Sequence, residues 1–199
     1  MCAMDGELSR ATLLARGGKV AATVVAASAF GGLATRASAA VPDGDLAYAR
    51  LLVALELLSL DFYTRAIDAC GGSQLELRRA RAAERRHYDV AAAVLTDAGQ
   101  VAATAQDIDF SYPRGSFSSW SAVAKLGVRL ESLSLGAYLG AVRSLQTPLY
   151  REHAARAAAS EAQHLSFFAG EVGGRRLGPP LPAALTIDRA SDALDAFTS

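Results

Sequence analysis

Two stretches of the chain, AAERRHYDV (82–90) and AASEAQHLS (158–166), share one short pattern. Each holds a glutamate followed three residues later by a histidine: Glu84 and His87, then Glu161 and His164. The chain has only 3 histidines, so two of them belong to this pattern. Side chains three residues apart lie on one face of an α-helix. The pattern therefore predicts two helices that each present a carboxylate and an imidazole on the same face.

A matching repeat precedes each of these stretches. The chain reads LELLSLDFY at 55–63 and LESLSLGAY at 130–138. Glu56 thus corresponds to Glu131, and the two glutamate–histidine patterns follow with nearly the same offset between them. Alanine-rich helices can imitate a repeat, but they do not keep rare polar positions in step. We interpret the pattern as a duplicated helix hairpin.

Glycine, proline and apolar periodicity divide the chain into four helices, at about 45–69, 73–97, 119–146 and 148–170. Gly71-Gly72 separates the first two and Thr147-Pro148 the last two, so each pair forms an antiparallel hairpin. The non-helical stretch 99–118 is long enough to cross the length of a bundle. The sequence predicts an all-α four-helix bundle of two antiparallel hairpins joined by a long crossover, over residues 40–172. A tail at 173–199 would contain a short helix.

The glutamates and histidines fall on the inward faces of these helices. Their neighbours at heptad-like spacing are apolar or small: Leu77, Ala80, Ala91 and Val94 on the second helix, and Tyr150, Ala154, Ala157 and Phe168 on the fourth. Four unpaired buried carboxylates would be strongly destabilising. Arg85, Arg86 and Arg129 fall mostly on other faces. Two divalent cations would balance the charge, and mixed oxygen and nitrogen ligands suit iron or manganese. A metal-free bundle and a single zinc site are the alternatives.

This ligand pattern resembles that of the ferritin-like di-iron and di-manganese carboxylate proteins. The chain is most similar to the small exported ferritin-like proteins of bacteria, over residues 45–170. The resemblance implies two iron ions, or alternatively manganese, bridged by two shared carboxylates. It implies terminal ligands Glu56 and His87 for one ion, Glu131 and His164 for the other, and bridging ligands Glu84 and Glu161.

The resemblance also implies a function. We expect an oxidoreductase that oxidises ferrous iron or reduces peroxide or dioxygen; the alternative is a non-catalytic metal-binding or stress-protective bundle. Tyr63 and Tyr138 are either redox-active or packed in the core with satisfied hydroxyls. Hydroxylation of an organic substrate would need a pocket, for which residues 110–120 are candidates. His153 has no counterpart in the repeat and is expected at the surface.

Residues 1–39 differ from the rest of the chain. Three basic residues precede the apolar run 20–34, which is short for a membrane span and ends near Ala37-Ser38-Ala39. This arrangement predicts a signal peptide cleaved after Ala39; an uncleaved anchor and a disordered terminus are the alternatives. Residues 9–14 resemble a twin-arginine signal, although Ala11 replaces its second arginine. We expect an exported mature chain that does not span the membrane.

Composition narrows the partners. The formal net charge is 0 and no basic block is present, which argues against a nucleic-acid partner. The two cysteines cannot form a disulfide framework, and no cysteine pair has zinc-binding spacing. The expected partners are metal ions with dioxygen or peroxide, and a homo-oligomer is compatible with the sequence.

Overall fold

The computed structural model of the chain describes residues 40–70, 75–173 and 180–198. The predicted signal peptide and the link at 71–74 lie outside these ranges. The described part is helical and contains no strand: α2 (Asp43–Ala69), α3 (Leu75–Asp97), α4 (Trp120–Ser144), α5 (Pro148–Gly173), α6 (Ile187–Leu194) and a 3-10 turn, η1 (Asp195–Phe197). No helix in these ranges is both long enough and apolar enough to cross a membrane.

The helix ends follow the local chemistry of the sequence. Ser119 precedes α4 and its hydroxyl accepts a hydrogen bond from the Ala122 amide at 3.2 Å, which caps the helix. Pro148 is the first residue of α5, where a missing amide proton costs nothing. The Asp45 carboxylate of α2 accepts the amides of Gln146 and Thr147 at 2.8 and 2.9 Å. Asp45 therefore ties the start of α2 to the start of α5.

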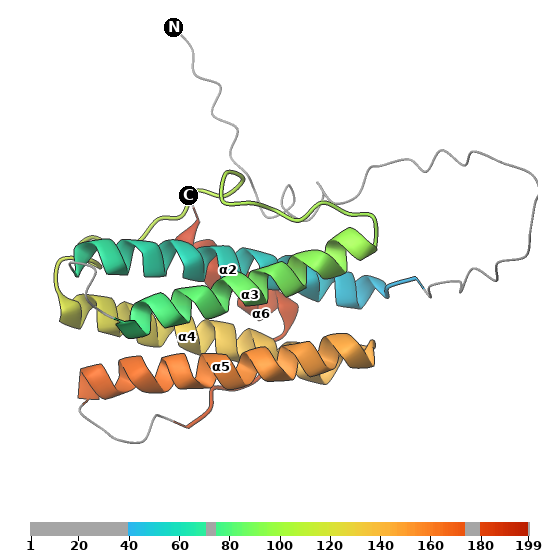
Figure 1. Cartoon of the computed structure of the whole chain (residues 1–199). Helices are drawn as coiled ribbons and strands as arrows, with labels where there is room; N and C mark the ends of the chain where they lie inside the picture. The colour runs from blue at the N-terminus through green and yellow to red at the C-terminus, as the bar shows by residue number, and fades with distance from the viewer. Residues whose placement is uncertain (1–39, 71–74, 174–179, 199) are drawn as a thin grey trace, which may run out of the picture.

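The four long helices form the predicted bundle of two hairpins. Helix α2 packs on α3, and α4 packs on α5 (Figure 1). The two hairpins meet mainly through α2 and α4, which lie side by side. The crossover, residues 98–119, runs back along α2. Tyr112 anchors it by donating a hydrogen bond to Asp61 Oδ2 at 2.9 Å. The expectation of two antiparallel hairpins joined by a long crossover is confirmed.

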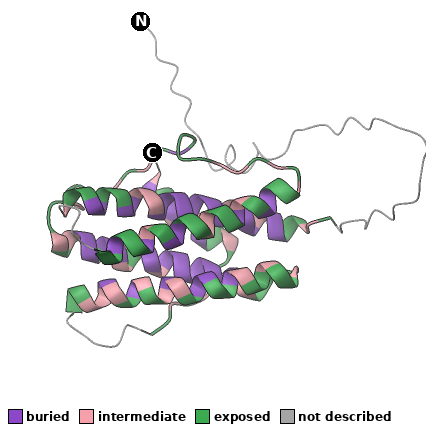
Figure 2. Cartoon of the chain, in the orientation of Figure 1, coloured by how far each residue is buried: buried purple, intermediate pink, exposed green. Residues whose placement is uncertain are grey.

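The core lies between the four helices, and α2 is buried over most of its length (Figure 2). The C-terminal segment covers the side of α2 and α4 that faces away from α3 and α5. Leu185 donates its amide to the Gly136 carbonyl at 2.8 Å, and a Cβ on Gly140 would overlap the Leu185 carbonyl oxygen. These two glycines of α4 therefore let the tail backbone approach the helix closely. Helix α6 then packs on both α2 and α4.

Candidate metal centre

The six predicted ligand residues meet in the centre of the bundle, one or two from each long helix. Glu56 comes from α2 and Glu131 from α4, while α3 and α5 each supply a glutamate and a histidine. All four glutamates are at most 1% exposed. The side chains of His87 and His164 are 14% and 12% exposed. The structure therefore brings together every residue that the sequence pattern selected.

The ligand atoms form two overlapping groups. One contains Glu56, Glu84, Glu161 and His87; the other contains Glu131, Glu84, Glu161 and His164. Within each group the ligand atoms all lie within 4.8 Å of one another. Glu84 and Glu161 belong to both groups. This sharing matches the bridging role that the family resemblance implies for them.

Each histidine faces the carboxylates of both hairpins. His87 Nδ1 lies 3.0 Å from Glu161 Oε1 and 3.2 Å from Glu84 Oε2. His164 Nδ1 lies 2.8 Å from Glu84 Oε1 and 3.7 Å from Glu161 Oε2. Each imidazole also has a contact with a third carboxylate: His87 Nδ1 lies 3.8 Å from Glu56 Oε1, and His164 Nδ1 lies 3.7 Å from Glu131 Oε2. The centre therefore has approximate twofold symmetry, as the sequence duplication predicts.

Several of these buried atoms have no hydrogen-bond partner. They are Glu56 Oε2, Glu84 Oε1, Glu131 Oε2, both oxygens of Glu161, and His164 Nδ1. The 2.8 Å contact between Glu84 and His164 thus lacks hydrogen-bond geometry. Buried polar atoms are rarely left unpaired. Convergent lone pairs without donors are what a cation site requires, so the residues present fit a pair of metal ions.

Two tyrosines connect the halves of the repeat. Tyr63 of α2 donates its hydroxyl hydrogen to Glu131 Oε1 of α4, and Tyr138 of α4 donates to Glu56 Oε1 of α2. Burial, together with the nearby carboxylates, raises the pKa of both tyrosines well above the usual range. They therefore remain protonated donors. The duplicated sequence placed a tyrosine near each glutamate, but the hydrogen bond to the glutamate of the other half is visible only in the structure.

The protonation of the metal-free centre is unusual. Burial and the neighbouring carboxylates raise the pKa of Glu56 well above its usual range, and burial likewise raises that of Glu131. Burial alone would lower the pKa of His87, but its contacts with Glu161 and Glu84 raise it to about 9. The pKa of His164 is raised further, by its contacts with Glu131, Glu161 and Glu84. Burial would raise the pKa of Glu84, yet its contacts with both imidazoles lower it to about 2. Without metal, the protonated imidazoles of His87 and His164 therefore supply the positive charge beside the carboxylates.

Other residues that the sequence singled out lie outside the centre. Arg85, Arg86 and Arg129 are exposed, as expected, and do not neutralise the glutamates. Residues 110–120 do not line the cavity beside the centre. Instead Phe117 packs on Phe62 with ring centroids 6.2 Å apart, and Trp120 packs on Phe167 and Phe168. The suggestion that this segment forms a substrate pocket is wrong for this cavity, because its aromatic rings fill the core at that end.

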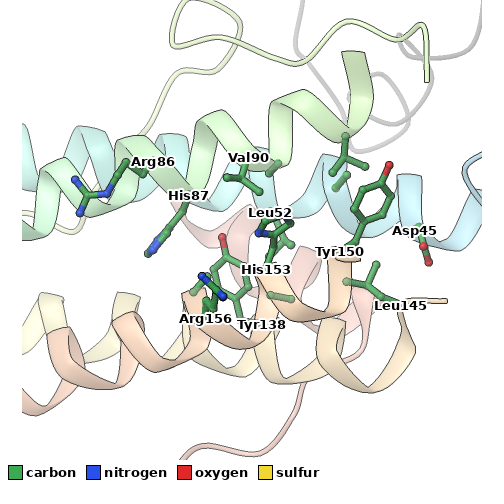
Figure 3. Close-up of a pocket in the computed structure, with 15 residues that line it drawn as sticks. Asp45, Leu52, Arg86, His87, Val90, Tyr138, Leu145, Tyr150, His153 and Arg156 are labelled. Atoms are coloured by element: carbon green, nitrogen blue, oxygen red, sulfur yellow. The ribbon is translucent and has the colours of Figure 1, made fainter. Parts of the chain in front are cut away.

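The cavity lies instead between α3 and α5, on the His87 side of the centre (Figure 3). We call it the slot; it has a volume of about 340 Å³. Its walls are mostly apolar, and His87 and Tyr138 form part of them. His153, half-buried rather than at the open surface, also lines it. The full lining is Asp45, Ala49, Leu52, Arg86, His87, Val90, Ala91, Val94, Tyr138, Leu145, Tyr150, His153, Ala154, Arg156 and Ala157.

Comparison with known protein families matches residues 44–173 to the ferritin-like domain. The chain belongs to this family. The match covers α2 to α5, the four helices that supply the six residues. No curated protein matches the chain. The family and the cluster of carboxylates and histidines together make a metal site possible in this ferritin-like protein.

Proposed function

We propose that this ferritin-like protein binds two iron ions, or alternatively manganese ions, and acts as an exported oxidoreductase. In this proposal Glu56 and His87 bind one ion, Glu131 and His164 bind the other, and Glu84 and Glu161 bridge them. The observation that carries the proposal is the pair of overlapping ligand groups that share these two glutamates. The expected reaction is oxidation of ferrous iron, or reduction of peroxide or dioxygen.

Charge balance supports the choice of two divalent ions. With neutral imidazoles, the carboxylates of Glu56, Glu84, Glu131 and Glu161 carry four negative charges, which two divalent cations would cancel. A single zinc ion would leave part of this buried charge uncompensated, and such charge is costly in a low-dielectric core. Carboxylate and imidazole ligands also suit iron or manganese, whereas thiolate-rich sites select softer metals.

The surrounding residues would orient the ligands and exclude water, as redox chemistry at the centre requires. Two ferrous ions, when bound, can supply two electrons to dioxygen or peroxide. The hydrogen bonds from Tyr63 and Tyr138 fix the orientation of Glu131 and Glu56. Such bonds to metal ligands hold the ligand geometry and tune its basicity. Phe62 and Phe168, both 0% exposed, help to exclude water at the His164 end.

The test is anaerobic loading with ferrous iron, followed by exposure to air or peroxide. We expect about two iron ions per chain by elemental analysis, and rapid stoichiometric oxidation seen as ferric absorbance. Metal binding without oxygen or peroxide consumption would support the non-catalytic alternative and contradict the oxidoreductase. Failure to bind iron or manganese would contradict the whole proposal.

Paired variants test the ligands themselves. We expect Glu84→Gln with Glu161→Gln to abolish loading of both ions, because each ion loses both shared ligands. The matched control is Glu76→Gln with Glu152→Gln, which changes exposed glutamates of the same two helices, α3 and α5. Circular dichroism would check that the helices persist. Full metal content in the Glu84 and Glu161 variant would show that the ligand assignment is wrong.

Export is the remaining part of the proposal. It is supported by the basic residues, the apolar run and the small-residue motif in residues 1–39. Mass spectrometry of the protein recovered from a bacterial host would test it. A mature chain beginning at Ala40 is expected, and a full-length chain in the cytoplasm would contradict it.

A further inference from the structure

The two halves of the repeat carry different side chains next to their histidines. On the His87 side, Val90 and Ala91 line the open slot. The positions that stand in the same relation to His164 hold Phe167 and Phe168. These rings and Trp120 pack together, with centroids 5.1 to 6.4 Å apart; we call the three aromatic residues the plug. Aromatic rings therefore pack between α4 and α5 at the positions beside His164, whereas the equivalent positions beside His87 line an open slot.

The positions facing these residues have changed together. Phe168 packs so closely on Gly127 of α4 that a Cβ there would lie 2.6 Å from its ring. The counterpart of Gly127 in the first half of the repeat is Leu52, which lines the slot together with Ala91. One half thus pairs glycine with phenylalanine, and the other pairs leucine with alanine. Because alanine is much shorter than phenylalanine, the space beside Ala91 stays open as the slot.

The charged groups around the slot are mainly positive. Arg86 and Arg156 line it together with His153 (Figure 3). No ion pair involves Arg86 within residues 40–70, 75–173 and 180–198. Arg156 pairs with the exposed Glu152 at 2.8 Å. Asp45, the acid in the lining, already has both oxygens bonded to backbone amides. The slot therefore combines apolar walls with two guanidinium groups, of which that of Arg156 is shared with Glu152.

We propose that the slot is a binding site for a small organic acid with an apolar chain. The carboxylate would pair with the guanidinium groups of Arg86 and Arg156, whose planar donors suit it. The chain would lie against Leu52, Val90 and Ala91, beside His87. A volume of about 340 Å³ is at the small end of the range for ligand pockets, roughly 300–1,000 Å³. The inference goes beyond the proposed function, because such binding does not require metal.

Calorimetric titration with octanoate, octanol and octylamine tests the ligand class on the purified full chain, with and without chelator. We expect saturable one-to-one binding of octanoate, and weaker binding of octanol and octylamine. Val90→Glu and Val90→Lys place opposite charges at an exposed position of the lining. The first should weaken octanoate binding about threefold and the second should strengthen it about threefold, as expected for exposed charge pairs. Equal affinities for the three probes, or no effect of the charge, would overturn the proposal.

A second pair of variants tests the location. Leu52→Gly with Ala91→Phe copies the arrangement of Gly127 and Phe168 into the open half. This plugged variant should weaken octanoate binding at least about tenfold. Ala93→Phe, an exposed position on the same helix, should leave it unchanged. Should the plugged variant fail to fold, Ala157→Leu narrows the slot from α5 and should also weaken binding. Octanoate binding that survives both slot variants would overturn the proposal.

Discussion

Each buried tyrosine of the candidate metal centre contacts a residue from the other half of the repeat. Tyr63 lies on the helix of Glu56 but donates to Glu131, and Tyr138 lies on the helix of Glu131 but donates to Glu56. Both rings also pack edge-on against the imidazoles, Tyr63 on His164 and Tyr138 on His87, with centroids 6.1 and 6.0 Å apart. Each tyrosine therefore supports the terminal ligands of one proposed metal ion.

Removing one tyrosine hydroxyl should therefore weaken the binding of one ion more than that of the other. We expect Tyr138→Phe to lower affinity at the Glu56 and His87 position about tenfold, because Glu56 Oε1 loses its donor. Tyr63→Phe should do the same at the Glu131 and His164 position. Stepwise metal titration would measure the two affinities. The control, Tyr48→Phe, removes a hydrogen bond to Ser144 outside the centre and should leave both unchanged. Equal weakening by all three variants would contradict a role in positioning.

The raised histidine pKa values predict how metal binding depends on pH. At neutral pH both imidazoles of the metal-free centre are protonated, because the pKa of His87 is about 9 and that of His164 is higher. A metal ion must displace these protons, so affinity should rise with pH, and less steeply once His87 has titrated, because His164 still carries its proton there. The rise should be about tenfold per pH unit for each proton displaced.

Calorimetry of manganese binding in buffers of different ionisation enthalpy would count the released protons. We expect at least two per loaded chain at about pH 7, one from each imidazole. No proton release, or affinity that falls as pH rises, would show that the imidazoles are not displaced from their carboxylate partners.

At the scale of elements, glycines of α4 allow other segments to approach this helix closely. Gly127 makes room for the Phe168 ring, while Gly136 and Gly140 let the C-terminal segment lie against α4. These positions sit on the same helix as Glu131 but serve different neighbours. The tail then places α6 over the side of α2 and α4 opposite the slot. Helix α4 is thus held by close contacts on two sides.

A methyl group at Gly140 should displace this tail. The new Cβ would overlap the Leu185 carbonyl oxygen, so the backbone of the tail must move. We expect Gly140→Ala to lower the free energy of unfolding by about 1–3 kcal/mol, the usual cost of overpacking. Trypsin should also cleave faster at Arg189 in α6, an exposed residue. The control Gly44→Ala adds the same methyl group where the nearest atom is 3.9 Å away. It should not destabilise the protein.

At the scale of the whole molecule, the fold and the clustering of the six candidate ligand residues were predictable for a common reason. Both depend on periodic features: apolar spacing marked the helices, and the nearly constant offset between the two halves aligned the glutamates and histidines. The long crossover was visible as a break in helical pattern. These features can be read from the sequence alone, because a helix places side chains on one face at a fixed residue spacing.

Other features depend on which side chains meet across the bundle. The hydrogen bonds donated by Tyr63 and Tyr138 run from one half of the repeat to the other. They form only because α2 and α4 face each other, and periodicity does not specify which helices do so. The slot arises from differences between the halves, such as Ala91 against Phe168. These differences are present in the sequence of the repeat, but matched polar positions alone do not indicate them. The role of Asp45 could not be predicted, because its amide partners, Gln146 and Thr147, lie about 100 residues away in the link between α4 and α5.

The proposed metal pair joins all four long helices, so loading should stabilise the entire bundle. The metal-free protein should still fold, because protonated His87 and His164 offset part of the buried negative charge. A free metal concentration of about one hundred times Kd would add roughly 2.7 kcal/mol. For a domain of this size, that corresponds to a rise in Tm of about 5–10 °C.

Differential scanning calorimetry with and without manganese would measure this shift, using buffer at constant pH. The Glu84→Gln and Glu161→Gln variant should show no shift, whereas Glu76→Gln with Glu152→Gln should behave as wild type. An equal rise in all three proteins would mean that metal stabilises the chain through surface carboxylates. Because the proposed bridge connects α3 and α5 through Glu84 and Glu161 and not through Glu76 and Glu152, the difference between the paired variants isolates the contribution of that bridge.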